Sequence, residues 1–141
     1  MNLVNDCVKW LENLAEQYGV NIVETDKLPP TAPSSSYKAK NLIILNLNTK
    51  NSLAYELAHE LGHLLLTTAN HKYHALDEHN EFCESKANQF ALRLIYSYCL
   101  DTHRCFKDLD DFANSFQLKT QDVTQYQSEI YLLCGHNLPA A

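Results

Sequence analysis

The pattern His-Glu-x-x-His over residues 59–63, placed inside a helical repeat, constrains this chain more than any other feature of its sequence. Successive residues of an α-helix turn by about 100°, so His59 and His63 lie within about 40° of each other on one face. A second face, roughly 150° away, carries leucines at positions 53, 57, 61 and 64. The sequence therefore predicts a helix over residues 51–67, with one side for a hydrophobic core and another for a pair of imidazoles.

This pair of imidazoles is suited to a metal ion. Two histidines one turn apart can hold one zinc ion through ring nitrogens at about 2.0–2.1 Å. Glu60 projects beside them and can reach a water molecule on the metal without being a ligand itself. Zinc lowers the pKa of such a water toward about 7, which supplies a nucleophile at neutral pH. The alternative interpretation is a surface helix with incidental histidines.

A catalytic zinc usually has three protein ligands, so a third ligand is expected on another element. Glu84 is the best candidate, because a helix beginning near it would carry Ala87 and Ala91 on the same face. These two small side chains would allow that helix to approach the histidine helix closely. Neither of the rival carboxylates, Glu78 and Glu81, begins such a face.

Two supporting roles are less well defined by the sequence. Asn88, one turn after Glu84, is placed to orient a ligand histidine through a hydrogen bond. A donor for the oxyanion that forms when a metal-bound water attacks a carbonyl group, commonly a tyrosine or histidine, is not identified. The candidates share the polar loop between the two metal helices: His71, Tyr73, His74 and His79. Taken singly, each is better explained as part of a polar surface loop.

The rest of the pattern predicts an α+β fold that is mainly helical, with a small sheet of about three strands packed beside the metal helix. The 141 residues fit one domain, residues 1–141. Besides the helix over 51–67, the expected elements are an N-terminal helix over 3–18, a strand over 20–24, a strand pair across 36–47 with a turn near 39–41, the second ligand helix over 81–100, and C-terminal helices over 106–116 and 121–134.

Charge and composition exclude several functions. Eleven basic against 17 acidic residues give a net charge of −6, which disfavours nucleic-acid binding and favours a basic partner. The pattern of residues 111–120 is typical of a helix-turn-helix, but the surrounding aspartates would repel a DNA backbone. We therefore expect this segment to pack in the core around Leu109, Phe112 and Phe116.

No segment approaches the roughly 18 apolar residues of a membrane span, and we expect no secretory signal at the start of the chain. With five scattered cysteines expected to be reduced, we predict a cytoplasmic protein.

Two motifs together resemble the ImmA/IrrE family of metallopeptidases. One is His-Glu-Leu-Gly-His over residues 59–63, followed by three leucines, and the other is Glu-x-x-Ala-Asn-x-Phe-Ala over residues 84–91. The likeness extends loosely to the N-terminal helix and to the strand before the metal helix. One departure is Arg-Leu-Ile-Tyr over residues 93–96, where the family often has a Leu-Leu-Met-Pro-like ending.

The resemblance implies a compact, zincin-like fold of the gluzincin type. It implies that His59, His63 and Glu84 are the zinc ligands and that Glu60 is the general base. Small members of the family, on phages and mobile elements, inactivate a partner repressor, typically by cleaving it. The resemblance therefore implies a protein substrate, namely a DNA-binding helix-turn-helix repressor, and a zinc-dependent endopeptidase.

Two other functions are compatible with the sequence. The chain could be an antirepressor that binds its partner without proteolysis, with zinc as a structural feature. It could also be a zinc peptidase with a housekeeping or toxin-like substrate. Substitution of Glu60 by Gln separates the first of these from an endopeptidase, because it removes the expected base and keeps the metal ligands.

Overall fold

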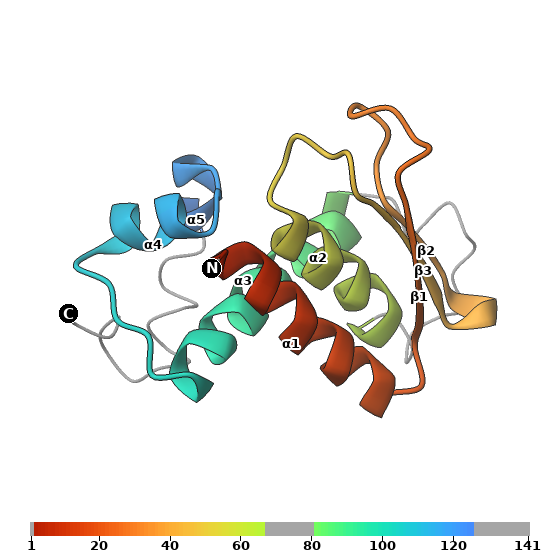
Figure 1. The fold of residues 1–141 in the computed structure, drawn as a ribbon, viewed down its shortest axis with the longest axis horizontal. Helices are drawn as coiled ribbons and strands as arrows, with labels where there is room; N and C mark the ends of the chain where they lie inside the picture. The colour runs from red at the N-terminus through yellow and green to blue at the C-terminus, as the bar shows by residue number, and fades with distance from the viewer. Residues whose placement is uncertain (1, 67–80, 126–141) are drawn as a thin grey trace.

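The computed structural model describes residues 2–66 and 81–125, and in these the mainly helical α+β fold is confirmed. Figure 1 shows a small sheet at one end, helices α1, α2 and α3 packed beside it, and the short helices α4 and α5 at the other end. In chain order the elements are α1 (Leu3–Gln17), β1 (Asn21–Thr25), β2 (Ser35–Tyr37), the 3-10 turn η1 (Lys38–Lys40), β3 (Leu42–Asn46), α2 (Leu53–Leu66), α3 (Glu81–Asp101), α4 (Leu109–Ser115) and α5 (Thr120–Gln125).

The sheet has the strand order β1-β3-β2, so the apolar strand β3 lies in the middle, parallel to β1 and antiparallel to β2. Ile43 and Leu45 of β3 are fully buried and join the core with α2. Asn41, in the left-handed region with φ 46°, is the single residue between η1 and β3. The register sets Ser36 of β2 opposite Ile43, and therefore on the face of the sheet that carries the core. This register brings a serine hydroxyl toward the metal helix.

A network of hydrogen bonds fixes the start of the metal helix to the loop before β2. The buried side chain of Asn46 donates to the carbonyls of Pro29 and Ala32, and its backbone N–H donates to the hydroxyl of Ser34. The Ser34 hydroxyl in turn donates to Glu56 of α2 at 2.6 Å. The loop over residues 27–34 is thereby tied to α2.

Helices α2 and α3 pack closely through small residues. Leu57 and Leu61 of α2 are fully buried, as the predicted leucine face requires, and so is Ala91 of α3, while Ala87 is 1% exposed. A Cβ added to Gly62 would lie 3.1 Å from the Cα and 3.3 Å from the carbonyl oxygen of Ala87. Glycine at this position therefore allows the backbones of α2 and α3 to approach each other. This explains why α2 contains glycine here, although glycine has a low helix propensity.

We expect Gly62→Ala to destabilise the protein by about 1–3 kcal/mol, since the added methyl group meets the backbone of α3 and forces the helices apart. The same shift would move Glu84 away from the histidines and weaken metal binding. Urea unfolding of the metal-free protein and zinc titration measure the two effects. Helix propensity alone predicts an unchanged or increased free energy of unfolding. That result would show that α3 can move away from α2 without loss of stability.

The C-terminal part belongs to the core. Phe112 of α4 and Phe116, which follows it, are fully buried, and Leu109 packs against the same cluster. This agrees with core packing rather than with a DNA-reading surface. Residues 126–134, which were predicted to continue the last helix, lie outside the described residues. No helix in the described ranges is long and apolar enough to cross a membrane.

Candidate metal centre

Three side chains from two helices converge on one point. Nε2 of His63 lies 3.1 Å from Nε2 of His59 and 2.9 Å from Oε1 of Glu84. Nε2 of His59 lies 3.0 Å from Oε2 of Glu84. Among the described residues, these three side chains are the group of histidine, cysteine and acidic residues whose ligand atoms approach within 4.8 Å of one another.

This arrangement fits a metal ion of the size of zinc. Ligand atoms placed tetrahedrally at 2.0–2.1 Å from zinc are separated by about 3.3 Å, close to the separations seen here. Two imidazole nitrogens and one carboxylate oxygen form one of the donor sets of catalytic zinc sites, in which the fourth position stays open. The three predicted ligands are therefore brought together in a geometry that could hold one metal ion.

The helix packing explains why the three ligands meet. His59 and His63 are one turn apart on α2, and their ring centroids are 4.7 Å apart. The closely packed α3 carries Glu84 across from them, one turn before the buried alanine face begins. The side chain of His63 is 5% exposed and that of Glu84 is 38% exposed. The site is therefore buried on the side of His63 and open to solvent on the side of Glu84.

Glu60 lies beside these three side chains, lines the cleft next to them and is 9% exposed. Burial raises its pKa from the ordinary value of 4.5 to about 7. A hydrogen bond with the Ser36 side chain acts in the opposite direction, and the negative charges of Glu84 and Glu56 add to the rise. A carboxylate with a pKa near neutrality is well suited to accept and return a proton.

The pKa of Glu60 predicts how the metal-free protein responds to pH. The folded state binds this proton more tightly than the unfolded chain, so the free energy of unfolding falls as the pH rises from about 4.5 to about 7. The difference between the two pKa values corresponds to about 3 kcal/mol. We therefore expect Glu60→Gln to stabilise the metal-free protein by up to about 3 kcal/mol at pH 8, and far less at pH 5.

Urea unfolding of both proteins in the presence of a chelator, at pH 5 and at pH 8, tests this expectation. Taking the difference between the two proteins at each pH removes the contribution of the other titrating groups. If Gln stabilises the protein equally at both pH values, the effect comes from packing and not from the buried charge.

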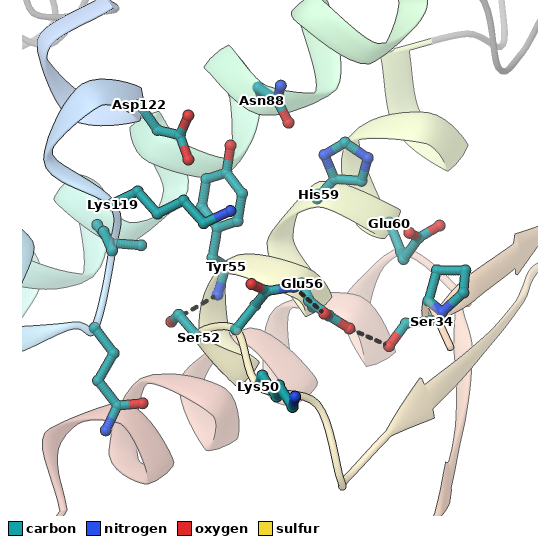
Figure 2. Close-up of a pocket in the computed structure, with 14 residues that line it drawn as sticks. Ser34, Lys50, Ser52, Tyr55, Glu56, His59, Glu60, Asn88, Lys119 and Asp122 are labelled. Carbon is teal, nitrogen blue, oxygen red and sulfur yellow. Dashed lines mark hydrogen bonds between the residues drawn. The ribbon is translucent and has the colours of Figure 1, made fainter. Parts of the chain in front are cut away.

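A cleft of about 350 Å³ extends from the metal site along the N-terminal half of α2 (Figure 2). One wall is formed by α2 itself, with Tyr55, Glu56 and His59, and the other by Leu118 and Lys119 at the turn between α4 and α5. Clefts of this volume are typical of ligand sites. The C-terminal wall is separated by more than fifty residues from the motif it faces, and no sequence pattern indicated its position.

Asn88 lines the same cleft near His59 (Figure 2). The buried Nδ1 of His59 has no hydrogen-bond partner among the described residues, so the orienting role of Asn88 stays a prediction. The oxyanion donors considered from the sequence, His71, Tyr73, His74 and His79, lie outside the described residues. Ser36, which contacts the expected base, was missed by the sequence analysis. Only the strand register could have indicated it.

Two histidines one turn apart, a glutamate from the following helix and a buried glutamate next to a cleft are typical of the HExxH metallopeptidases as a class. Comparison with family models gave a match to the IrrE N-terminal-like domain, Peptidase_M78, over residues 15–125. The chain therefore belongs to this family and is a metallopeptidase of the IrrE/ImmA type. Searches of curated proteins and of solved structures gave no match.

Proposed function

We propose that this protein is a zinc-dependent endopeptidase and that its substrate is a helix-turn-helix repressor of a phage or mobile element. The observation that carries the chemistry is the convergence of His59, His63 and Glu84 within hydrogen-bond distance of one another, with the buried Glu60 beside them. The substrate is inferred from family membership and from the resemblance in the two motifs. Such a substrate would place the reaction in the cytoplasm.

The side chains at the site have separate roles in hydrolysis. His59, His63 and Glu84 would hold the ion, which supplies, when bound, a Lewis acid and a more acidic water molecule. Glu60 takes a proton as the water oxygen bonds to the carbonyl carbon of the substrate. It then gives this proton to the amide nitrogen as the C–N bond breaks, which releases a carboxylic acid and an amine; the acid then loses its proton to the solvent. The hydrogen bond with Ser36 holds the Glu60 carboxylate in place for both transfers.

The sheet offers a way to bind an extended peptide next to Glu60. β2 is an edge strand, and its outer edge is not paired with any strand that the structure describes. Because Ser36 of this strand contacts Glu60, a peptide that pairs with the edge would run close to the base. A cleft that is open to solvent admits a chain that continues on both sides of the bond, as an endopeptidase needs.

Intact-mass spectrometry tests the proposal. The purified, zinc-loaded protein is incubated with the helix-turn-helix repressor encoded beside its gene, and the Glu60→Gln variant and a chelator serve as controls. We expect two complementary fragments with the wild-type protein and none with either control. An uncut repressor would contradict this substrate, and fragments that also form with the variant would indicate a contaminating protease.

A further inference from the structure

The carboxylate of Glu56 joins the metal helix to two other segments of the chain. Its Oε1 accepts a hydrogen bond of 2.6 Å from the hydroxyl of Ser34, the residue just before β2. Its Oε2 accepts from Thr49 and Asn51, which both lie in the loop between β3 and α2. The Ser34 side chain also accepts from the backbone N–H of Asn46 and is buried, so water competes little for these hydrogen bonds. One side chain of α2 therefore holds the start of β2.

The contact between a serine and a glutamate is repeated along the same two segments. Ser36 follows Ser34 by two residues, and Glu60 follows Glu56 by four. Two residues of an extended chain advance by about 6.6 Å, and four residues of an α-helix advance by about 6 Å. A strand and a helix that lie side by side can therefore repeat a contact at these spacings.

The structure has both of these contacts. Ser34 donates to Glu56, and Ser36 is hydrogen-bonded to Glu60. Figure 2 shows both glutamates on the side of α2 that faces Ser34. Because the two serines belong to one extended segment, a shift of Ser34 along or away from α2 would also move Ser36. The first contact thus sets the position of the second.

β2 has few other restraints. It is three residues long and pairs with β3 alone among the strands that the structure describes. A short edge strand opens more easily than a central strand, because few hydrogen bonds hold it. Its place beside α2 therefore depends strongly on the hydrogen bond at its start.

We propose that Ser34 and Glu56 are positioning residues: their hydrogen bond fixes β2 beside α2 and so keeps Ser36 against the expected base Glu60. Neither residue belongs to the three converging metal-binding groups, so both act on the reaction through Ser36. The effect on hydrolysis rests on the proposed peptidase function, whereas the anchoring of β2 can be measured without a substrate.

Amide hydrogen exchange of the zinc-loaded protein, followed by mass spectrometry, tests this anchoring. Ser34→Ala removes the donor without a change of charge. We expect exchange in residues 35–37 to become about 10-fold faster, as for loss of a hydrogen bond to a charged group, and exchange in α1 to stay unchanged. Unchanged exchange in residues 35–37 would overturn the proposal. An equal rise in α1 would overturn it as well, because it would indicate a general loss of stability.

Ser115→Ala is the matched control for loss of one hydroxyl group. The Ser115 hydroxyl donates to the carbonyl of Asp111 within α4, away from the cleft that the described residues form. We expect wild-type exchange in β2 and wild-type cleavage for this variant.

Two substitutions of Glu56 provide a second test, which leaves Ser34 and its contact with Asn46 in place. Glu56→Ala and Glu56→Gln remove the same negative charge, but the amide of Gln can still hydrogen-bond to the Ser34 hydroxyl. We expect Ala to speed exchange in β2 and to lower kcat for the repressor by about 10- to 100-fold, as for a misplaced catalytic group. Gln should keep both values within about 3-fold of those of Glu56→Ala's parent, the wild-type protein. If Ala and Gln have equal effects, the charge matters and the hydrogen bond does not, which would overturn the proposal.

A double-mutant cycle separates positioning from a general effect on the structure. Ser34→Ala and Ser36→Ala should each lower kcat and leave KM within about 3-fold, since β2 stays paired with β3. If Ser34 acts through Ser36, adding Ser34→Ala to Ser36→Ala lowers kcat by less than about 3-fold further. Independent losses that multiply would overturn the positioning role and leave the peptidase in place. If the wild-type protein does not cut the repressor, the proposed function fails, and exchange in β2 then upholds or overturns the anchoring on its own.

Discussion

Substitution of Glu60 by Gln is expected to lower kcat/KM for the cleaved protein by about 10²- to 10⁴-fold, the usual contribution of a positioned general base. Gln has nearly the same shape but cannot take up a proton from water. The fold and the three metal ligands stay in place, because Glu60 is not itself one of the converging groups. Zinc content and affinity for the substrate protein should therefore remain at wild-type values.

Three measurements on the same preparation check this expectation: zinc content by elemental analysis, binding of the repressor by calorimetry, and fragment formation over time. Glu16→Gln, at an exposed position of α1, is the control for loss of one carboxylate. A reporter gene under the repressor separates cleavage from binding. If Glu60→Gln relieves repression as fully as the wild-type protein does, the biological mechanism is antirepression by binding and not proteolysis.

Substitution of Glu84 by Gln is expected to lower zinc affinity by about 100-fold or more. Even the loss of a residue that only hydrogen-bonds to a zinc ligand typically lowers metal affinity by about 10- to 100-fold. The amide keeps the shape of the side chain but loses the negative charge that balances the metal. The carboxylate is partly exposed, so the fold should tolerate this change. Peptidase activity at limiting zinc should fall in parallel with the affinity.

Competition with a chromophoric zinc chelator measures this affinity. Glu81→Gln is the matched control, because Glu81 begins the same helix α3 and was a rival third ligand from the sequence. We expect wild-type affinity for Glu81→Gln. If Glu81→Gln lowers the zinc affinity and Glu84→Gln does not, the third ligand is Glu81, and α3 packs against α2 in a different way.

The metal helix and its partner were predictable because their signals are local. The histidine spacing and the leucine face follow from the period of a single helix, and the predicted range 51–67 agrees with the observed Leu53–Leu66. The second helix, predicted over residues 81–100, is observed as Glu81–Asp101. The choice of Glu84 rested on two alanines that predicted a close approach; both are buried, and Ala87 lies next to Gly62 of α2.

The sheet was predicted in outline, since a short apolar strand between turn residues is also a local signal. The sequence did not determine its register, which depends on pairing between segments that are far apart in the chain. That register places Ser36 against Glu60, and a shift by one residue would turn the serine to the opposite face.

By itself, then, the sequence determined the helix that carries His59, Glu60 and His63 and the family, and it singled out Glu84 as the expected third ligand, because each of these depends on spacing within one segment. Only the tertiary structure decided what surrounds these groups. The burial that raises the pKa of Glu60 and the cleft wall that carries Lys119 come from segments that have no periodic relation to the motif. Solvent exclusion and charge at a site depend on the sum of neighbours in space, and that sum cannot be obtained from spacing along the chain.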